Sequence, residues 1–273
     1  MHKDGLSEGE RLQFGGMARW DGLDLFGPNF MSLAYRKDGE IHIQVEASNI
    51  SKIENPLTLR VSHLPVVRSI FLWARLLFQV VGSFWTLLFF AATMAVLWIF
   101  VRLMEFGSGG GGPFGGLFSF LAEFPILPIL LVFFAGMKLS PIGRYHGAEH
   151  KAVAAYEKYG EVTMQTARLS SRVHPRCGTN ILAYIVLAAL LDPLIGWWGY
   201  AFLQFILISE AWFIFGQTHP SIAVGNFFQR YLTTTEPRRT ELEVAVESMN
   251  RLLEAEQGCA GEEERRVRVP ARY

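Results

Sequence analysis

Long apolar runs separated by polar segments are the most prominent pattern in the chain. Residues 80–101 contain no charged side chain, and about 20 apolar residues in a helix are enough to cross the hydrocarbon core of a bilayer. Three weaker runs follow at residues 117–136, 180–198 and 200–216, each interrupted by proline or by an acidic residue. This pattern predicts an α-helical membrane protein built on a four-span helical bundle, in which the second run either crosses or re-enters the bilayer.

Basic residues are concentrated between the apolar runs. Of the 25 Lys and Arg, nine lie in residues 1–79, seven in residues 137–180 and eight in residues 217–273. By the positive-inside rule, both termini and the loop 137–179 are expected on the cytoplasmic side of the cell membrane. The predicted partner is the lipid bilayer, and the formal net charge of zero does not indicate a nucleic-acid partner.

A β-structured domain is expected before the first apolar run. After a polar segment at 1–13, residues 14–63 contain the alternating runs FMSLAYR and EIHIQVE on either side of Lys37-Asp38-Gly39. Alternation around an Asp-Gly turn is typical of a β-hairpin. We therefore expect a small cytoplasmic β-structured domain at 14–63, followed by a membrane domain at 64–216.

An amphipathic helix is expected near the C-terminus. Residues 217–256 read as an interfacial segment followed by a helix, whose apolar side chains recur with helical spacing. The charged segment 257–273 is expected to be disordered. The predicted apolar stripe comprises Leu242, Ala245, Val246, Met249, Leu252 and Leu253.

Two histidines and two glutamates occur at helical spacing in RYHGAEHKAVAAYE, residues 144–157. On a helix, His146, Glu149 and His150 lie within one turn of each other, and Glu157 continues the same stripe. The order H-x-x-E-H is found in inverzincin metallopeptidases, where the imidazoles bind zinc. The alternative is a polar helix whose His and Glu side chains hydrogen-bond each other.

A second group of donors follows in HPRCGTN, residues 174–180. Imidazole nitrogen and thiolate sulfur are preferred ligands of zinc and iron, so His146, His150, His174 and Cys177 could together bind a divalent metal, with zinc favoured. Four protein ligands would make a closed structural site, whereas three ligands and a water would make a catalytic one. Glu149 would then support a ligand or act as general base. The sequence does not choose between these sites.

Two acidic residues lie inside the apolar runs. A carboxylate in the centre of a bilayer costs about 2.5–3.5 kcal/mol on insertion scales, so Asp192 and Glu210 are expected to face protein. Glu210 should lie near the His/Cys cluster and is a further candidate site residue, whereas Asp192, followed by Pro193, is expected at a helix turn. The two cysteines, Cys177 and Cys259, lie in segments expected in the cytoplasm, where a disulfide is not expected.

Several blocks of the sequence, namely YHGAEHKAVAAYE, SSRVHPRCGTN, QRYLTTTEP and LEVAVESMN, resemble those of the YqhQ-like bacterial membrane proteins. This family of unknown function is often described as predicted metal-dependent enzymes. The resemblance extends over about residues 14–256. At GGMARWDGL the chain departs from the pattern expected for the family, because Met17 replaces a glutamine. The metal or catalytic residues that the resemblance implies are His146, Glu149, His150, His174 and Cys177.

Two functions are compatible with these features. The first is a membrane metallohydrolase, similar to a peptidase, in which Glu149 activates water. The second is a non-enzymatic scaffold or regulator whose His/Cys cluster is structural and which binds a membrane or cytoplasmic protein, with a homo-oligomer also open. A transporter that uses Asp192 and Glu210 as a relay would require either more spans than four or an oligomer.

Overall fold

The computed structural model describes residues 12–48, 64–71, 126–195 and 201–267, together with isolated positions between 99 and 119. The chain divides into two compact units. Unit 1 comprises residues 1–54, 136–177 and 226–273, and unit 2 comprises residues 55–135 and 178–225.

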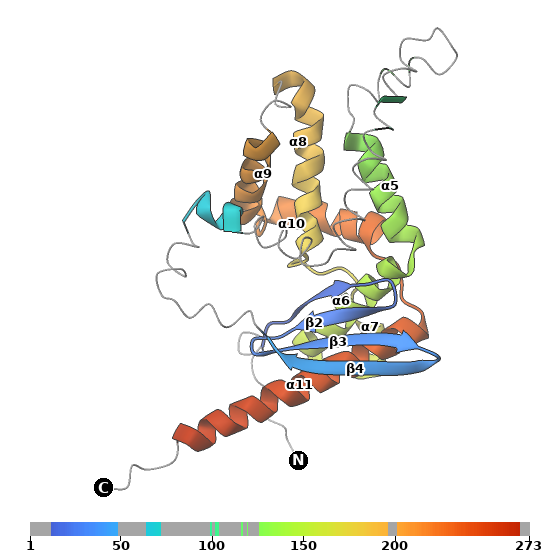
Figure 1. Ribbon diagram of the computed structural model, residues 1–273, viewed down its shortest axis with the longest axis vertical. Helices are drawn as coiled ribbons and strands as arrows, with labels where there is room; N and C mark the ends of the chain where they lie inside the picture. Colours follow the sequence, from blue (N-terminus) through green and yellow to red (C-terminus); the bar gives the residue numbers. More distant parts are fainter. Residues whose placement is uncertain are drawn as a thin grey trace. The chain divides into compact units, whose positions relative to one another are not determined.

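Unit 1 contains a four-stranded antiparallel sheet in the order β1-β2-β3-β4 (Figure 1). The strands are β1 Gly15–Ala18, β2 Gly22–Phe26, β3 Phe30–Lys37 and β4 Glu40–Ala47. The predicted hairpin is confirmed, because Lys37 pairs with Glu40 across a two-residue turn. Asp38 and Gly39 both have positive φ, at 52° and 88°, as a type I′ turn requires.

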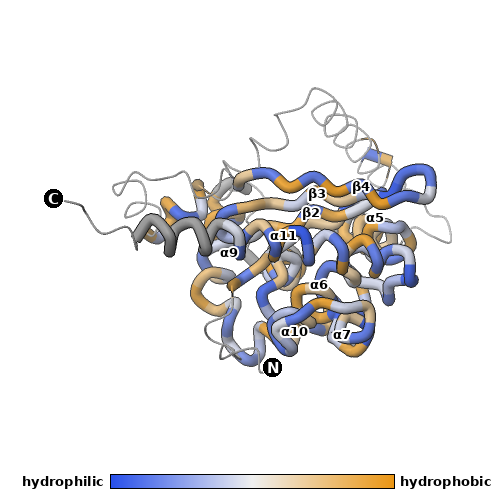
Figure 2. Tube along the Cα trace, turned by 90° about the horizontal axis from the view of Figure 1, so that it is seen from below, coloured by the Kyte–Doolittle hydropathy of each residue, from blue (hydrophilic) through white to orange (hydrophobic). Residues whose placement is uncertain are grey.

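Helices cover one face of this sheet. In the described part of the chain, three α-helices lie wholly in unit 1: α6 Pro141–Tyr159, α7 Met164–Leu169 and α11 Arg239–Val267. α11 contacts β2, β3 and β4, while α6 contacts β1 and β2, and Figure 2 shows the sheet as one layer with α6 and α11 on the same side. Leu23 and Leu25 of the sheet are fully buried against Ala148 of α6 and Met249 of α11. Apolar burial between the sheet and the two helices thus fixes α6 in place.

The predicted stripe on α11 is confirmed, since all six of its apolar side chains are buried. The helix continues to Val267, beyond the predicted boundary at residue 256. Glu and Arg, which dominate residues 262–266, are strong helix formers, so a charged composition did not prevent helix formation there. Near its middle, α11 places Glu256 against the turn between β2 and β3. The backbone N–H of Asn29 and that of Phe30 both donate to its Oε1, at 2.8 and 2.9 Å.

The predicted four-span bundle is wrong. Among the described residues, no helix combines the length and the apolar character needed to cross a membrane. The runs at 180–198 and 200–216 contain α8 Ile181–Ile195 and α9 Ala201–Phe215, of 15 residues each. At 1.5 Å per residue each helix is about 22 Å long, short of the hydrocarbon core of about 30 Å. The predicted multi-pass localisation in the cell membrane, with both termini cytoplasmic, was inferred from these spans and is therefore also wrong.

The other two predicted spans lie largely or partly outside the described residues. The run 80–101 falls outside the described residues except for position 99. Of the run 117–136, the structure describes position 119 and residues 126–136, which belong to α5, Ile126–Leu139. The remaining helical elements are η2 Gly178–Asn180, α10 His219–Phe228 and a π-helical segment, η4, Gln229–Thr233. Asp192 and Pro193 lie within α8. The described fold is therefore an α+β unit and a second unit of short helices.

Glu210 belongs to unit 2, where its carboxylate is fully occupied. It accepts hydrogen bonds from the Arg68 guanidinium at 2.6 Å and from the Ser69 hydroxyl at 2.6 Å. It also accepts one from the backbone N–H of Val66 at 3.0 Å, which precedes a helical segment starting at Val67. Carboxylates are favourable at helix N-termini because they satisfy free N–H groups there. Glu210 therefore has a structural role, as an ion-pair partner and a helix cap.

Glu210→Gln should destabilise the protein at neutral pH and much less in acid. Hydrogen bonds from Arg68 lower the pKa of Glu210 to about 2 from the ordinary 4.5. The stabilisation is thus fully present above about pH 4.5 and is lost as pH falls toward about 2. We expect a cost of about 1–2 kcal/mol at pH 7, reduced because solvent reaches this pair, measured by urea unfolding at pH 7 and pH 3. The exposed Glu161→Gln is the matched control. An equal loss at both pH values would contradict this assignment.

Candidate metal centre

Helix α6 carries the two histidines of the site and is defined at both ends by local signals. Pro141 stands in its first turn and Gly160, with φ of 75°, ends it, as is common at helix starts and stops. Segment 235–237 passes so close to α6 that a side chain at Gly147 would collide with the carbonyl oxygen of Thr235. α6 is therefore buried on several sides, and both of its histidines lie in the interior.

Both imidazoles are held by backbone carbonyls. His146 Nδ1 lies 3.0 Å from the carbonyl oxygen of Thr233, and His150 Nδ1 lies 2.8 Å from that of Arg172. Because a carbonyl oxygen only accepts, Nδ1 carries the proton in each ring and donates it. The Nε2 atom of each ring therefore presents a lone pair, as in histidines that bind metals through Nε2.

Cys177 meets these histidines in the interior. Its Sγ lies 3.3 Å from His146 Nε2, and one ligand atom from each of His146, His150 and Cys177 lies within 4.8 Å of the other two. Zinc bonds of about 2.0–2.1 Å to nitrogen and 2.3 Å to sulfur place adjacent tetrahedral ligands about 3.5 Å apart. The three side chains are 6%, 3% and 8% exposed. This group could hold a metal ion, and the sequence had predicted all three of its residues.

Burial also keeps both imidazoles in the form that binds metals. It lowers the pKa of His146. Burial, followed by the proximity of His146, lowers the pKa of His150 well below its ordinary value. A protonated imidazole has no free lone pair, so these shifts leave the nitrogens available at neutral pH.

His174, the fourth predicted ligand, lies beside the group and has other partners. Its Nε2 lies 2.9 Å from Glu157 Oε2, and its Nδ1 accepts the backbone N–H of Arg176 at 3.3 Å. The proton therefore sits on Nε2 and is donated to Glu157. Its ring centroid is 5.9 Å from that of His150. The structure thus brings three predicted donors together and pairs the fourth with Glu157.

The Glu157 carboxylate contacts two side chains, those of Arg176 and His174. Its Oε1 pairs with the Arg176 guanidinium, while Oε2 accepts from His174. Burial raises the pKa of the Glu157 carboxyl, but the hydrogen bond from His174 and the charge of Arg176 outweigh this effect and lower it. Glu157 is thus an anion that fixes the His174 ring.

Glu149, the predicted general base, faces the sheet. A Cβ added at Gly16 of β1 would lie 2.8 Å from Glu149 Cδ, so the carboxyl packs directly on the strand. Burial raises the pKa of Glu149 to about 8, and within the described part of the chain no hydrogen bond or ion pair reaches its carboxyl. Helical spacing placed Glu149 near the histidine face, but packing of β1 on α6 determined what it contacts.

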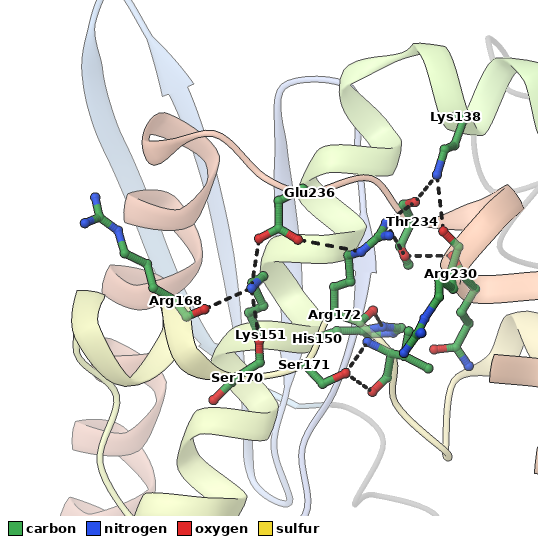
Figure 3. Close-up of polar contacts among 12 residues, drawn as sticks. Lys138, His150, Lys151, Arg168, Ser170, Ser171, Arg172, Arg230, Thr234 and Glu236 are labelled. Atoms are coloured by element: carbon green, nitrogen blue, oxygen red, sulfur yellow. Dashed lines mark hydrogen bonds and ion pairs between the residues drawn. The ribbon is translucent and has the colours of Figure 1, made fainter. Parts of the chain in front are cut away.

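A set of polar contacts that the sequence did not indicate holds the backbone near the carbonyls of Thr233 and Arg172, which bind the two histidines (Figure 3). Glu236 lies between two cations, 2.9 Å from Lys151 Nζ and 3.6 Å from Arg172 Nε. Arg172 also donates to the carbonyl oxygen of Thr234 at 2.9 Å. These bonds fix the backbone on both sides of the histidines. Lys151 gave no signal in the sequence, because its burial, at 5% exposed, is visible only in the fold.

Gln229 completes the framework by binding the backbone of His174 on both sides. Its Oε1 accepts from the His174 N–H at 2.7 Å and its Nε2 donates to the His174 carbonyl at 2.8 Å. Gln229 is completely buried. It therefore fixes the loop that leads to Cys177.

Comparisons with known proteins give no activity. The family model described as "Protein of unknown function (DUF1385)" matches residues 71–214. The uncharacterized protein YqhQ of Bacillus subtilis is 28% identical over 155 residues, covering 48% of this chain and 47% of that protein. The match thus spans about half the length of this relative. No solved structure matches the chain.

Proposed function

This chain belongs to the DUF1385 family of proteins of unknown function, and we propose that it binds one divalent metal ion, zinc, through His146, His150 and Cys177. The observation that carries the proposal is the orientation of the two imidazoles. Each donates Nδ1–H to a backbone carbonyl, at 3.0 and 2.8 Å, so both Nε2 lone pairs are available for the ion that Cys177 would share. A nitrogen and sulfur donor set of this kind favours zinc over the hard cations magnesium and calcium.

The number of ligands favours a reactive centre. Three protein ligands leave one coordination position open, which is typical of catalytic zinc sites. When bound in such a site, zinc acts as a Lewis acid that supports hydrolysis. The chain's own residues would orient the ligands through the Thr233 and Arg172 carbonyls and would exclude bulk water through burial. We therefore propose a metal-dependent hydrolase.

The second candidate is a structural metal centre in a regulator or scaffold that binds another protein. It is favoured by the sulfur ligand and by the burial of all three side chains below a tenth exposed, both typical of structural sites. In that case the metal would tie α6 to the loop that ends at Cys177. The two candidates share the same ligands and differ in the fourth position.

Purified protein should contain about one zinc ion per chain after incubation with zinc and dialysis. His146→Ala, His150→Ala and Cys177→Ser should each retain less than about a tenth of that amount, because loss of one of three ligands weakens binding by orders of magnitude. Inductively coupled plasma mass spectrometry measures the content. His42→Ala, on β4 of the same unit, is the matched control and should keep the full amount. A wild-type protein without metal, or equal loss in the control, would overturn the proposal.

Azide binding to the cobalt-substituted protein separates the two candidates. An open position accepts azide, so the visible cobalt spectrum should change in a saturable way for a hydrolase. A closed structural site would leave the spectrum unchanged and would favour the second candidate. The predicted role of Glu149 as general base is tested by Glu149→Gln, which should keep the metal in both cases and should lower hydrolysis only in the first.

A further inference from the structure

A cavity of about 580 Å³ in unit 1 lies beside the metal centre. It is bounded by one face of α6, by the loop 169–176 and by the chain just before β1. Its size is that of sites for small molecules. We propose that this cavity binds a small organic carboxylate with an apolar body, and that such compounds are the ligand class of the metal centre. The link to the metal rests on the proposed function.

The charges around the cavity select a singly charged anion. Lys158 and Arg176 contribute two positive charges, and Glu157 contributes one negative charge. His174 also lines the cavity, and both of its ring nitrogens already have partners, Glu157 and the backbone N–H of Arg176. The net charge of Lys158, Arg176 and Glu157 together is +1. It matches a carboxylate, whereas a phosphate monoester carries about −1.5 to −2 at neutral pH.

Lys158 supplies the free cation. Its ammonium lies 5.0 Å from the centroid of the Tyr159 ring, and among the described residues it has no carboxylate partner. Arg176, in contrast, already pairs with Glu157. A carboxylate entering the cavity would pair with Lys158 and share the outer side of the Arg176 guanidinium, which is 41% exposed. Removing Lys158 should therefore weaken binding without disturbing the Glu157–His174 pair.

Part of the remaining wall is apolar, while Gln13, Ser170 and Ser171 form its polar part. Leu12 and Leu169 line the cavity and are 38% and 68% exposed. Val173 and Pro175 extend the same wall. Covering these side chains would remove apolar surface from water, which favours a ligand with a hydrocarbon body over a compact ion. The cationic and the apolar parts of the wall together favour a ligand with an anionic head and an apolar chain.

The loop that forms the cavity also holds the metal centre. The carbonyl of Arg172 binds His150, His174 lines the cavity with its ring 5.9 Å from that of His150, and Cys177 follows directly. His174, rather than any of the three proposed metal ligands, lines the cavity, so a ligand there would act on the metal centre through this residue. The Glu157–His174 pair would be a positioning pair between the ligand and the centre.

Calorimetric titration of the full chain with hexanoate, acetate, hexylamine and inorganic phosphate tests this inference. Hexanoate should bind saturably with one site per chain, and acetate several-fold more weakly. Phosphate should bind more weakly than hexanoate, and hexylamine should not bind. Lys158→Gln should weaken hexanoate binding about tenfold, which corresponds to one lost ion pair of about 1.4 kcal/mol. Lys37→Gln, at the exposed end of β3, is the matched control. Leu169→Ser should remove the preference for hexanoate over acetate.

The outcomes separate this inference from the proposed function. Absence of saturable hexanoate binding, tighter binding of phosphate, or unchanged binding by Lys158→Gln in a protein that melts like the wild type would overturn the carboxylate cavity. Saturable hexanoate binding by a protein that takes up no zinc would overturn the proposed function and support the cavity. Zinc uptake without hexanoate binding would support the proposed function and overturn the carboxylate cavity.

Discussion

Glu256→Ala should lower the free energy of unfolding by about 3–5 kcal/mol. The Glu256 side chain is buried and accepts three hydrogen bonds, from the backbone N–H of Asn29, the Asn29 side-chain amide and the backbone N–H of Phe30, at 2.8–2.9 Å. Alanine removes the acceptor from all three donors, which lie in a turn that is exposed at Asn29 and partly buried at Phe30. Each bond to a charged group is worth about 1.5–3 kcal/mol, and water can replace part of this at the exposed turn. Thermal and urea unfolding of the full chain measure the effect.

Glu254→Ala is the matched control for this experiment. Glu254 lies two residues earlier on α11 and has a side chain that is 66% exposed. Among the described residues it pairs only with Arg251, so its loss should cost no more than about 0.5 kcal/mol. Gly27→Ala should resemble Glu256→Ala, because a methyl group at Gly27 would collide with Glu256 Oε1. Equal stability of the two alanine variants on α11 would show that Glu256 does not fasten α11 to the sheet.

Glu149→Gln should stabilise the metal-free protein at alkaline pH and remove most of its pH dependence. Burial raises the pKa of Glu149 to about 8, against an ordinary 4.5. The folded protein thus binds this proton more tightly than the unfolded chain, and stability falls as pH rises from about 4.5 to about 8. At 1.36 kcal/mol per pKa unit, and with relaxation around the charge, the variant should gain about 2–4 kcal/mol over the wild type at pH 8.5.

The same measurement at pH 5 provides an internal reference. There Glu149 is protonated in the folded protein, so the two proteins should differ by less than about 1 kcal/mol. Unfolding is followed with a chelator present, so that metal binding to the neighbouring histidines does not contribute. The exposed Glu254→Gln should leave the pH profile unchanged. A wild-type profile that rises from pH 5 to pH 8.5 would contradict the neutral, buried state of Glu149.

The metal centre shows how far spacing along the chain predicts a site. His146 and His150 stand four residues apart on a helix, and Cys177 follows His174 after two residues. Chemistry and spacing named four donors, of which the fold brings three together in a group that could hold a metal ion. Spacing could not separate them from His174, because all four are suitable donors. The partners that decide this, Glu157 and the backbone of Arg176, act through the folded loop.

The membrane prediction failed for a related reason. A hydropathy pattern registers a continuous apolar run, whereas a membrane span also needs one uninterrupted helix of sufficient length. Within the described residues, α8 and α9 comprise 15 residues each. The apolar composition was read correctly in these segments, but the lengths of the helices formed from them were not.

The sequence by itself determined the features that depend on neighbours in the chain. These are the β-hairpin at Asp38-Gly39, the apolar stripe of α11 and the supply of imidazole and thiol donors, all of which follow from backbone preferences and a helical or alternating period. Only the tertiary structure decided which donors meet, that Glu149 faces β1, and that Glu256 binds the turn at Asn29, 227 residues away. Such contacts depend on how distant segments pack, and no local period encodes that packing.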